Sequence, residues 1–211
     1  YIYTLSLHDA LPISWPISRV WPPEMHTMKL VILDRDGTIN EDSADYIKSV
    51  AEWKPLPGAL EAIAKLNHAG WHVVVASNQS GLGRGLFDVA TLNAMHAKMH
   101  KLLALAGGRV EAVFYCPHAP DQACRCRKPL PGLFEQIGER YGVALKGVPT
   151  VGDSARDIVA GAAVGCEPHL VLTGKGAALR GQPLPDNFPA GTRVHEDLLA
   201  FADYLVSRDT A

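Results

Sequence analysis

The fold is decided by one stretch of the chain, Leu33-Asp34-Arg35-Asp36-Gly37-Thr38-Ile39-Asn40. It continues an apolar run from Leu30 and has the form of a buried strand that ends in two aspartates separated by one residue, with Gly-Thr directly after them. An Asp-x-Asp pair is common, and a strand that ends in a polar turn also carries Asp and Gly, because both residues favour turn geometry. The rest of the chain therefore has to distinguish a chemical site from an ordinary turn.

From Met28 onward the sequence alternates short apolar strands with amphipathic helices. Near-continuous apolar strands separated by helices are typical of a parallel sheet covered on both faces, so we expect an α/β, Rossmann-like fold. Ligands of such sheets bind at the carboxyl ends of the strands. The expected strands are residues 30–34, 72–77, 112–116, 148–152 and 170–173, and the expected helices are residues 58–69, 88–106, 131–141, 154–161 and 196–206.

Size and composition exclude several classes of protein. With 211 residues, of which 47% are hydrophobic, the chain can bury one good core. A net charge of −2 is too small to suggest nucleic acid or a membrane surface as a partner. No stretch approaches the roughly 18 uninterrupted apolar residues of a membrane-spanning helix. We therefore expect a small-molecule substrate, no nucleic-acid or membrane partner, and a monomer as the default state.

Residues 1–27 differ from the rest of the chain. They contain four prolines and two tryptophans, show no sustained helical or strand period, and lack the basic start and apolar core of a signal peptide. Met28 is followed at once by a strand pattern. We expect Met28 to be the native start, residues 1–27 to be an extraneous or disordered leader, and residues 28–211 to form a single domain. A docking arm is the alternative for the leader.

Three further polar segments follow strands or precede helices. The second expected strand ends in Ser77-Asn78-Gln79-Ser80-Gly81, a turn whose hydroxyl, amides and backbone N–H groups can bind phosphate oxygens. Arg127-Lys128-Pro129 places a fixed cation before a helix start, which also favours anions. Val151-Gly152-Asp153-Ser154 ends another strand, and Asp157 lies four residues after Asp153. Singly, each has a structural explanation as an ordinary loop or a helix cap.

In this order, these segments resemble the four motifs of the haloacid dehalogenase superfamily. The resemblance covers residues 30–173 and implies a magnesium-dependent phosphatase without a large cap domain. By position, it implies Asp34 as nucleophile, Asp36 as general acid and base, Ser77 and Lys128 as phosphoryl-binding residues, and Mg²⁺ bound by Asp34, Asp153 and the backbone carbonyl of Asp36. It also implies that Asp157 supports this site without binding the ion.

The charges of these residues are consistent with the implied roles. A substrate phosphate carries about −1.5 to −2 near neutral pH. Its approach to ionised Asp34 and Asp153 needs compensation, which Mg²⁺ and Lys128 together supply. Asp36 is then expected to enter the reaction protonated, because acidic neighbours and the phosphate favour its neutral form. It would protonate the leaving alkoxide and later deprotonate the attacking water.

A cysteine-rich loop follows the third expected strand. Cys116, His118, Cys124 and Cys126 offer three thiolates and an imidazole, a set suited to a closed tetrahedral zinc site with a structural role. A disulfide or a coincidental group of thiols is the alternative. With no export signal recognised, we expect a reducing cytoplasm. Cys166 is expected to be a packing residue.

Together with the other motifs, this loop resembles the heptose 1,7-bisphosphate phosphatases, and histidinol-phosphate phosphatases are the nearest alternative. The resemblance implies a role in nucleotide-activated heptose synthesis for the lipopolysaccharide core. A catalytically silent binding module with this fold is a third possibility, against which the intact acidic motifs argue. The residues expected to contact substrate are Asp42, Tyr46, Asn78, Gln79, Ser80, Arg127 and Ser154, with Arg84 as a weaker candidate. His96 and His100 are expected on a solvated helix face.

Overall fold

The structure, a computed structural model, describes residues 28–209 and contains one six-stranded sheet in the order β3-β2-β1-β4-β5-β6. All five neighbouring pairs of strands are parallel, as the apolar strand pattern predicts. The strands are β1 (Leu30–Leu33), β2 (His72–Asn78), β3 (Ala112–Cys116), β4 (Pro149–Gly152), β5 (Glu167–Val171) and β6 (Arg193–His195).

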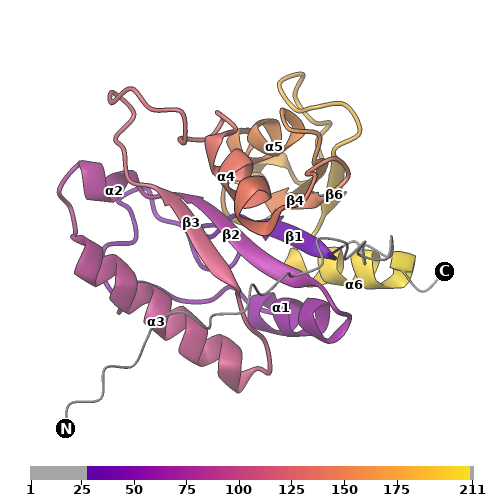
Figure 1. Cartoon of the computed structure of the whole chain (residues 1–211), viewed down its shortest axis with the longest axis horizontal. Helices are drawn as coiled ribbons and strands as arrows, with labels where there is room; N and C mark the ends of the chain where they lie inside the picture. Colours follow the sequence, from indigo (N-terminus) through magenta and orange to yellow (C-terminus); the bar gives the residue numbers. More distant parts are fainter. Residues whose placement is uncertain (1–27, 210–211) are drawn as a thin grey trace, which may run out of the picture.

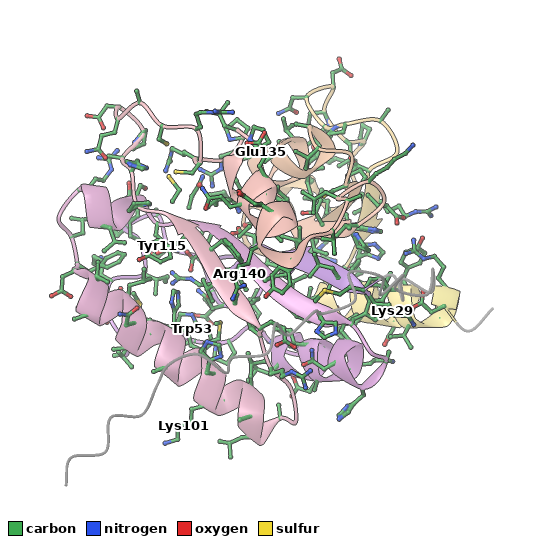
Figure 2. The ribbon with its side chains drawn as sticks, viewed as in Figure 1. Lys29, Trp53, Lys101, Tyr115, Glu135 and Arg140 are labelled. Carbon is green, nitrogen blue, oxygen red and sulfur yellow. The ribbon has the colours of Figure 1, made fainter. Side chains whose placement is uncertain are left out.

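Helices cover both faces of this sheet, which confirms the predicted layers. Figure 1 shows α4 (Gly132–Tyr141) and α5 (Ala155–Ala162) on one side of the strands. On the other side lie α1 (Ala59–His68), α3 (Val89–Leu105) and α6 (Leu198–Asp209). Trp53 is buried on the face covered by α3, whereas Glu135 and Arg140 belong to α4 on the opposite face (Figure 2).

The two faces form two separate hydrophobic cores that share the central strands. In β1, Val31 and Leu33 pack into the core under α1, α3 and α6, whereas Leu30 and Ile32 pack into the core under α4. All four side chains are almost completely buried. This alternation follows from the two-residue period of a strand, and it explains why β1 is apolar throughout. It holds the end of β1 in a fixed position within the sheet.

Some elements differ from the prediction. The fifth strand begins and ends earlier than expected, at Glu167 and Val171. Glu167 and Pro168 do not form an apolar run, but they belong to the strand because they pair with β4. The short strand β6 was not predicted, since Arg193 and Val194 are exposed and give no apolar run. Two short elements were also missed: α2 (Ser80–Gly83) and the 3₁₀ helix η1 (Gly174–Leu179).

The connections between the strands contain no inserted cap domain within residues 28–209, as predicted. A long loop links β1 to α1, and only α2 lies between β2 and α3. Within the same described range, no helix is long and apolar enough to cross a membrane. The prediction for the leader, residues 1–27, lies outside the described residues.

Candidate active site

The carboxyl ends of β1, β2 and β4 open into one cavity of about 470 Å³. Asp34 follows β1, Ser77 lies at the end of β2, and Lys128 precedes α4; all three line the cavity. Asp153 directly follows β4 and is buried. One of its carboxylate oxygens lies within 4.8 Å of a carboxylate oxygen of Asp34. The residues to which the superfamily motifs assign the chemistry are therefore brought together.

Lys128 joins the acidic residues of the site. Its ammonium Nζ donates to Asp34 Oδ1 at 2.8 Å and to the carbonyl of Ala76 at 2.7 Å, and it lies 2.6 Å from Asp157 Oδ1. The lysine is only 2% exposed. Although burial lowers the pKa of Lys128, the carboxylates of Asp157 and Asp34 raise it more strongly, so the ammonium stays charged.

The acidic cluster carries more negative charge than Lys128 compensates. Asp34, Asp153 and Asp157 are three carboxylates facing one ammonium. Burial, with repulsion from Asp157, raises the pKa of Asp34 to about 6, although Lys128 opposes the rise. Burial and the charges of Asp34 and Asp157 raise the pKa of Asp153 to about 8. When all three carboxylates are ionised, the cluster and Lys128 together carry a charge of −2. This charge and the set of oxygen ligands match what a divalent cation such as Mg²⁺ requires.

Both carboxylate oxygens of Asp157 already have partners within the protein. Its Oδ1 pairs with Lys128, and its Oδ2 accepts hydrogen bonds from the backbone N–H of Ser154, at 3.2 Å, and from the Ser154 hydroxyl. Asp34 and Asp153 are therefore the carboxylates best placed to hold an ion. Ser154, which the sequence assigns to the substrate, uses its hydroxyl to hold Asp157.

Gly37 brings the backbone after β1 against Asp153. Its φ is +83°, and a Cβ built on it would lie 2.1 Å from Asp153 Oδ2. Only glycine combines this left-handed backbone with such a close approach. The carbonyl of Gly37 also accepts a hydrogen bond of 2.6 Å from Thr173 Oγ1. The glycine of the first motif therefore places the Asp36–Gly37 turn directly beside the second acidic strand end.

Asp36 is held by a network of donors rather than left free. Arg35 donates to both of its carboxylate oxygens at 2.8–3.0 Å, Asn40 Nδ2 donates at 2.8 Å, and Gln79 Nε2 donates at 2.8 Å. Burial alone would raise the pKa of Asp36, but the charge of Arg35 and the hydrogen bonds from Asn40 and Gln79 lower it. Without a phosphate nearby, these donors favour the ionised form of Asp36. The expectation of a protonated Asp36 concerns the site with substrate bound and stays a prediction.

Arg35 is completely buried and links Asp36 to helix α3. Its Nη1 lies 3.2 Å from His96 Nε2, and its Nη2 donates to Gln79 Oε1 at 3.1 Å. Burial, together with Arg35, lowers the pKa of His96 to about 4, so the ring is neutral and can accept this hydrogen bond. The prediction of a solvated His96 is wrong, because a contact 61 residues away in sequence buries it. His100 is exposed, as predicted.

The predicted substrate contacts divide into two groups. Asn78 and Gln79 line the cavity but bind the protein itself: Asn78 exchanges two hydrogen bonds of 3.0 Å with the backbone of Lys128, and Gln79 binds Ser77, Arg35 and Asp36. The second group lines the cavity from its rim: Asp42, Tyr46 and Arg127 lie in loops, and Ser80 is the first residue of α2.

Within this second group, two residues have distinctive geometry. Tyr46 has a φ of +66°, a conformation that is rare for a non-glycine residue and often marks a functional site. Arg127 donates from Nη1 to the carbonyl of His118 at 3.3 Å, which ties it to the cysteine loop. Arg84 does not line the cavity; its guanidinium lies 5.9 Å from the centre of the Tyr46 ring.

Two cations of the cavity were missed from sequence, Lys175 and Arg156. Lys175 forms an ion pair with Asp42, and its backbone N–H donates to Asp153 Oδ2 at 2.7 Å. A Gly-Lys pair directly after a strand end was the available signal, since backbone N–H groups at such turns bind anions.

The cysteine loop brings its four expected ligands together. Cys116 Sγ lies 3.4 Å from His118 Nδ1 and 3.7 Å from Cys124 Sγ, and Cys126 Sγ lies 3.3 Å from His118 Nδ1. Tetrahedral zinc, with bonds of about 2.0–2.3 Å, separates its ligand atoms by about 3.5–3.8 Å. All four cysteines of the chain are free thiols, so the disulfide alternative is not formed. The donor set therefore fits zinc.

Cys166 lies apart from this loop, as predicted for a packing residue. It is 4% exposed and packs in the core under α4. Burial raises the pKa of its thiol to about 12, which makes it unreactive.

The fold and the four motif residues at or beside its cavity, Asp34, Ser77, Lys128 and Asp153, define a hydrolase of the haloacid dehalogenase type. A family model described as HAD-hydrolase-like matches residues 125–200. The D-glycero-beta-D-manno-heptose-1,7-bisphosphate 7-phosphatase of Bordetella bronchiseptica is 58% identical over 179 residues, which cover 85% of this chain and 98% of that protein. The protein of the same name from Pseudomonas aeruginosa is 55% identical over 177 residues, covering 84% and 97%.

A solved structure shows the same similarity in three dimensions. The crystal structure of D,D-heptose 1,7-bisphosphate phosphatase from B. bronchiseptica, complexed with magnesium and phosphate, matches this structure with a TM-score of 0.82. The aligned residues are 57% identical and cover 86% of this chain and 99% of the crystallised chain. The chain therefore belongs to the heptose bisphosphate phosphatase family of the haloacid dehalogenase superfamily.

Proposed function

We propose that this protein removes the 7-phosphate of D-glycero-D-manno-heptose 1,7-bisphosphate, as a step in nucleotide-activated heptose synthesis. The observation that carries the proposal is the position of Asp34, whose carboxylate lies at the cavity and is held by Lys128. Relatives that share more than half of their residues with this chain carry that activity in their names. Cationic side chains around the same cavity suit a substrate with two phosphates.

In the first half of the proposed reaction, a carboxylate oxygen of Asp34 attacks the phosphorus of the 7-phosphate. The bond to the sugar oxygen breaks, and an aspartyl-phosphate forms on Asp34. Lys128, already within 2.8 Å of Asp34, balances charge on the phosphoryl oxygens, and the Ser77 hydroxyl donates to one of them. Asp36 gives its proton to the departing sugar oxygen. In the second half, water attacks the phosphorus, Asp36 takes the proton from that water, and the bond between the phosphorus and Asp34 breaks, which releases inorganic phosphate and restores the Asp34 carboxylate.

This role requires Asp36 to change its partners. Arg35, Asn40 and Gln79 hold it as a carboxylate before substrate binds. The negative charge of an incoming phosphate raises the pKa of a nearby carboxyl group. Substrate binding would therefore raise the pKa of Asp36 and favour the protonated form that the reaction needs.

Two metal ions complete the proposal. Mg²⁺, held by Asp34, Asp153 and the backbone carbonyl of Asp36, would neutralise the buried acidic cluster and polarise the transferring phosphoryl group. Zn²⁺, held by Cys116, His118, Cys124 and Cys126, would stabilise the loop that carries Arg127 and Lys128. The free thiols fit a reducing cytoplasm. Because one chain supplies every residue of the site, we propose that a monomer is active.

Replacement of Asp34 tests the proposal. Asp34→Asn keeps the size of the side chain but removes the nucleophile, so hydrolysis of heptose 1,7-bisphosphate should fall more than about 100-fold, while thermal stability stays near that of the wild type. The substrate panel should include histidinol phosphate. A wild type that prefers histidinol phosphate, or an Asp34→Asn variant with more than about one hundredth of wild-type activity, would contradict the proposal.

A further inference from the structure

One pair of charges in the cavity has no role in the proposed chemistry. Lys175, at the start of η1, forms an ion pair with Asp42 in the loop after β1, 133 residues away in sequence. Both residues line the cavity that contains Asp34. The pair therefore connects two loops at the site where a substrate must enter.

The backbone of Lys175 is held at the acidic cluster, whereas its side chain reaches solvent. Its N–H donates to Asp153 Oδ2 at 2.7 Å. The preceding Gly174 packs so closely that a Cβ on it would lie 2.2 Å from Asp153 Oδ2 and 2.6 Å from the Cα of Gly37. In contrast, the side chain of Lys175 is 53% exposed, and Asp42 is its partner. The result is a cation on a long, half-exposed side chain whose backbone is anchored at the acidic cluster.

The pair with Asp42 can be exchanged at little cost. Lys175 is 53% exposed and Asp42 is 19% exposed, so solvent reaches the pair. Ion pairs that solvent reaches contribute little to stability, because water screens them and the long side chain loses freedom. A phosphate dianion carries more charge and more acceptor oxygens than Asp42 offers. Two other cations of the cavity are held more firmly: Lys128 is buried between two carboxylates, and Arg127 donates to the backbone of His118.

The strand order gives Lys175 a distinct position. Arg127 lies after β3, and Lys175 lies after β5, on opposite sides of β1 in the order β3-β2-β1-β4-β5-β6. Arg156, at the start of α5, also lines the cavity and adds positive charge on the β4–β5 side. A substrate whose reacting phosphate lies at Asp34 can therefore meet cations on either flank.

We infer that Lys175 binds the second, non-reacting phosphate of the substrate. Before substrate binds, Asp42 occupies the same cation, and the phosphate then replaces it. The inference deepens the proposed function and rests on it. Lys175 is then a specificity-determining residue: a substrate with only one phosphate leaves the Asp42–Lys175 pair intact and gains nothing from this cation.

Kinetics on two substrates test the inference. Lys175→Met keeps most of the length of the stem and removes the charge. It should raise KM for heptose 1,7-bisphosphate about tenfold or more, the size expected for one lost charged hydrogen bond, and change KM for heptose 7-phosphate less than about twofold. Lys175→Arg should restore most of the selectivity. Inhibition by heptose 1-phosphate, which carries only the distal group, should weaken in parallel.

The matched control is Lys65→Met. Lys65 also forms an exposed ion pair, with Asp203, but it lies on α1 away from the cavity. This variant should leave both KM values unchanged. Asp42→Asn should lower KM for the bisphosphate, because the competing carboxylate is gone. If Asp42→Asn instead raises KM for both substrates equally, Asp42 is a sugar contact and not a placeholder.

Failure of the inference differs from failure of the proposed function. A wild type that hydrolyses neither heptose phosphate contradicts the function. The inference is overturned if the wild type is active and Lys175→Met changes KM equally for both substrates, or for neither. The same holds if Arg127→Ala removes all preference for the bisphosphate while Lys175→Met removes none.

Discussion

Gly37→Ala should inactivate the protein through Asp153, and Gly70→Ala supplies a matched control. The two glycines have nearly the same backbone conformation, with φ of +83° and +85°. Alanine in this left-handed region costs roughly 1–2 kcal/mol, partly offset by lower entropy of the unfolded chain. At Gly70 a new Cβ meets nothing within 4 Å, whereas at Gly37 it would lie 2.1 Å from Asp153 Oδ2. Both variants should therefore lose similar stability from backbone strain, and only Gly37→Ala disturbs the site.

The size of the functional effect follows from that distance. Ordinary contact begins at 3.4 Å, so Asp153 Oδ2 must move by about 1.3 Å. A displacement of about 1 Å in a catalytic site costs on the order of 100-fold, or about 3 kcal/mol in transition-state stabilisation. The assays are kcat/KM on heptose 1,7-bisphosphate over a Mg²⁺ titration and thermal unfolding of both variants. Values of kcat/KM within about threefold of each other for Gly37→Ala and Gly70→Ala would refute the reasoning.

Three other predictions concern the loops and the sheet edge. Zinc analysis should give about one ion per chain, and Cys124→Ser should lower the melting temperature more than it lowers kcat, since the ion is not at the reacting phosphorus; a metal-free wild type of full stability would disprove this. Arg127→Ala should reduce kcat/KM for the bisphosphate by about 2–3 kcal/mol and for a monophosphate much less; equal losses would argue against a distal-phosphate contact. Burial, with His195 nearby, lowers the pKa of His169 from 6.5 to about 3, so the unfolded chain takes up a proton first as the pH falls below 6.5. Between pH 6.5 and 5 this group should cost about 2 kcal/mol of stability, as measured by urea unfolding, and His169→Gln should remove that part of the pH dependence; identical slopes for variant and wild type would contradict it.

The parts of the fold that the sequence predicts are those encoded by local pattern. Central strands such as β2 are buried on both faces and read as continuous apolar runs. Helix α1 ends at His68, two residues before Gly70, and glycine is a common residue just past a helix end. The edge of the sheet is different. The short strand β6 presents exposed side chains, and β5 includes Pro168, so only pairing with a neighbouring strand defines them.

The site divides in the same way. Asp34, Lys128 and Asp153 follow from motifs, because each lies next to a strand end or a helix start. His96 and Lys175 do not, because contacts with distant residues define their surroundings: Arg35 buries His96, and Asp42 pairs with Lys175. The local sequence pattern around His96 or Lys175 contains no sign of these long-range contacts.

The division of β1 between two cores limits where this protein can acquire new substrates. Val31 and Leu33 face one core, and Leu30 and Ile32 face the other. A shift of one residue would exchange these faces and turn Asp34 away from the cavity. The loops at residues 42–46 and 84–87 carry no such alternation. Variation confined to them can therefore redirect specificity while the nucleophile keeps its position, which makes these loops the natural targets for directed evolution.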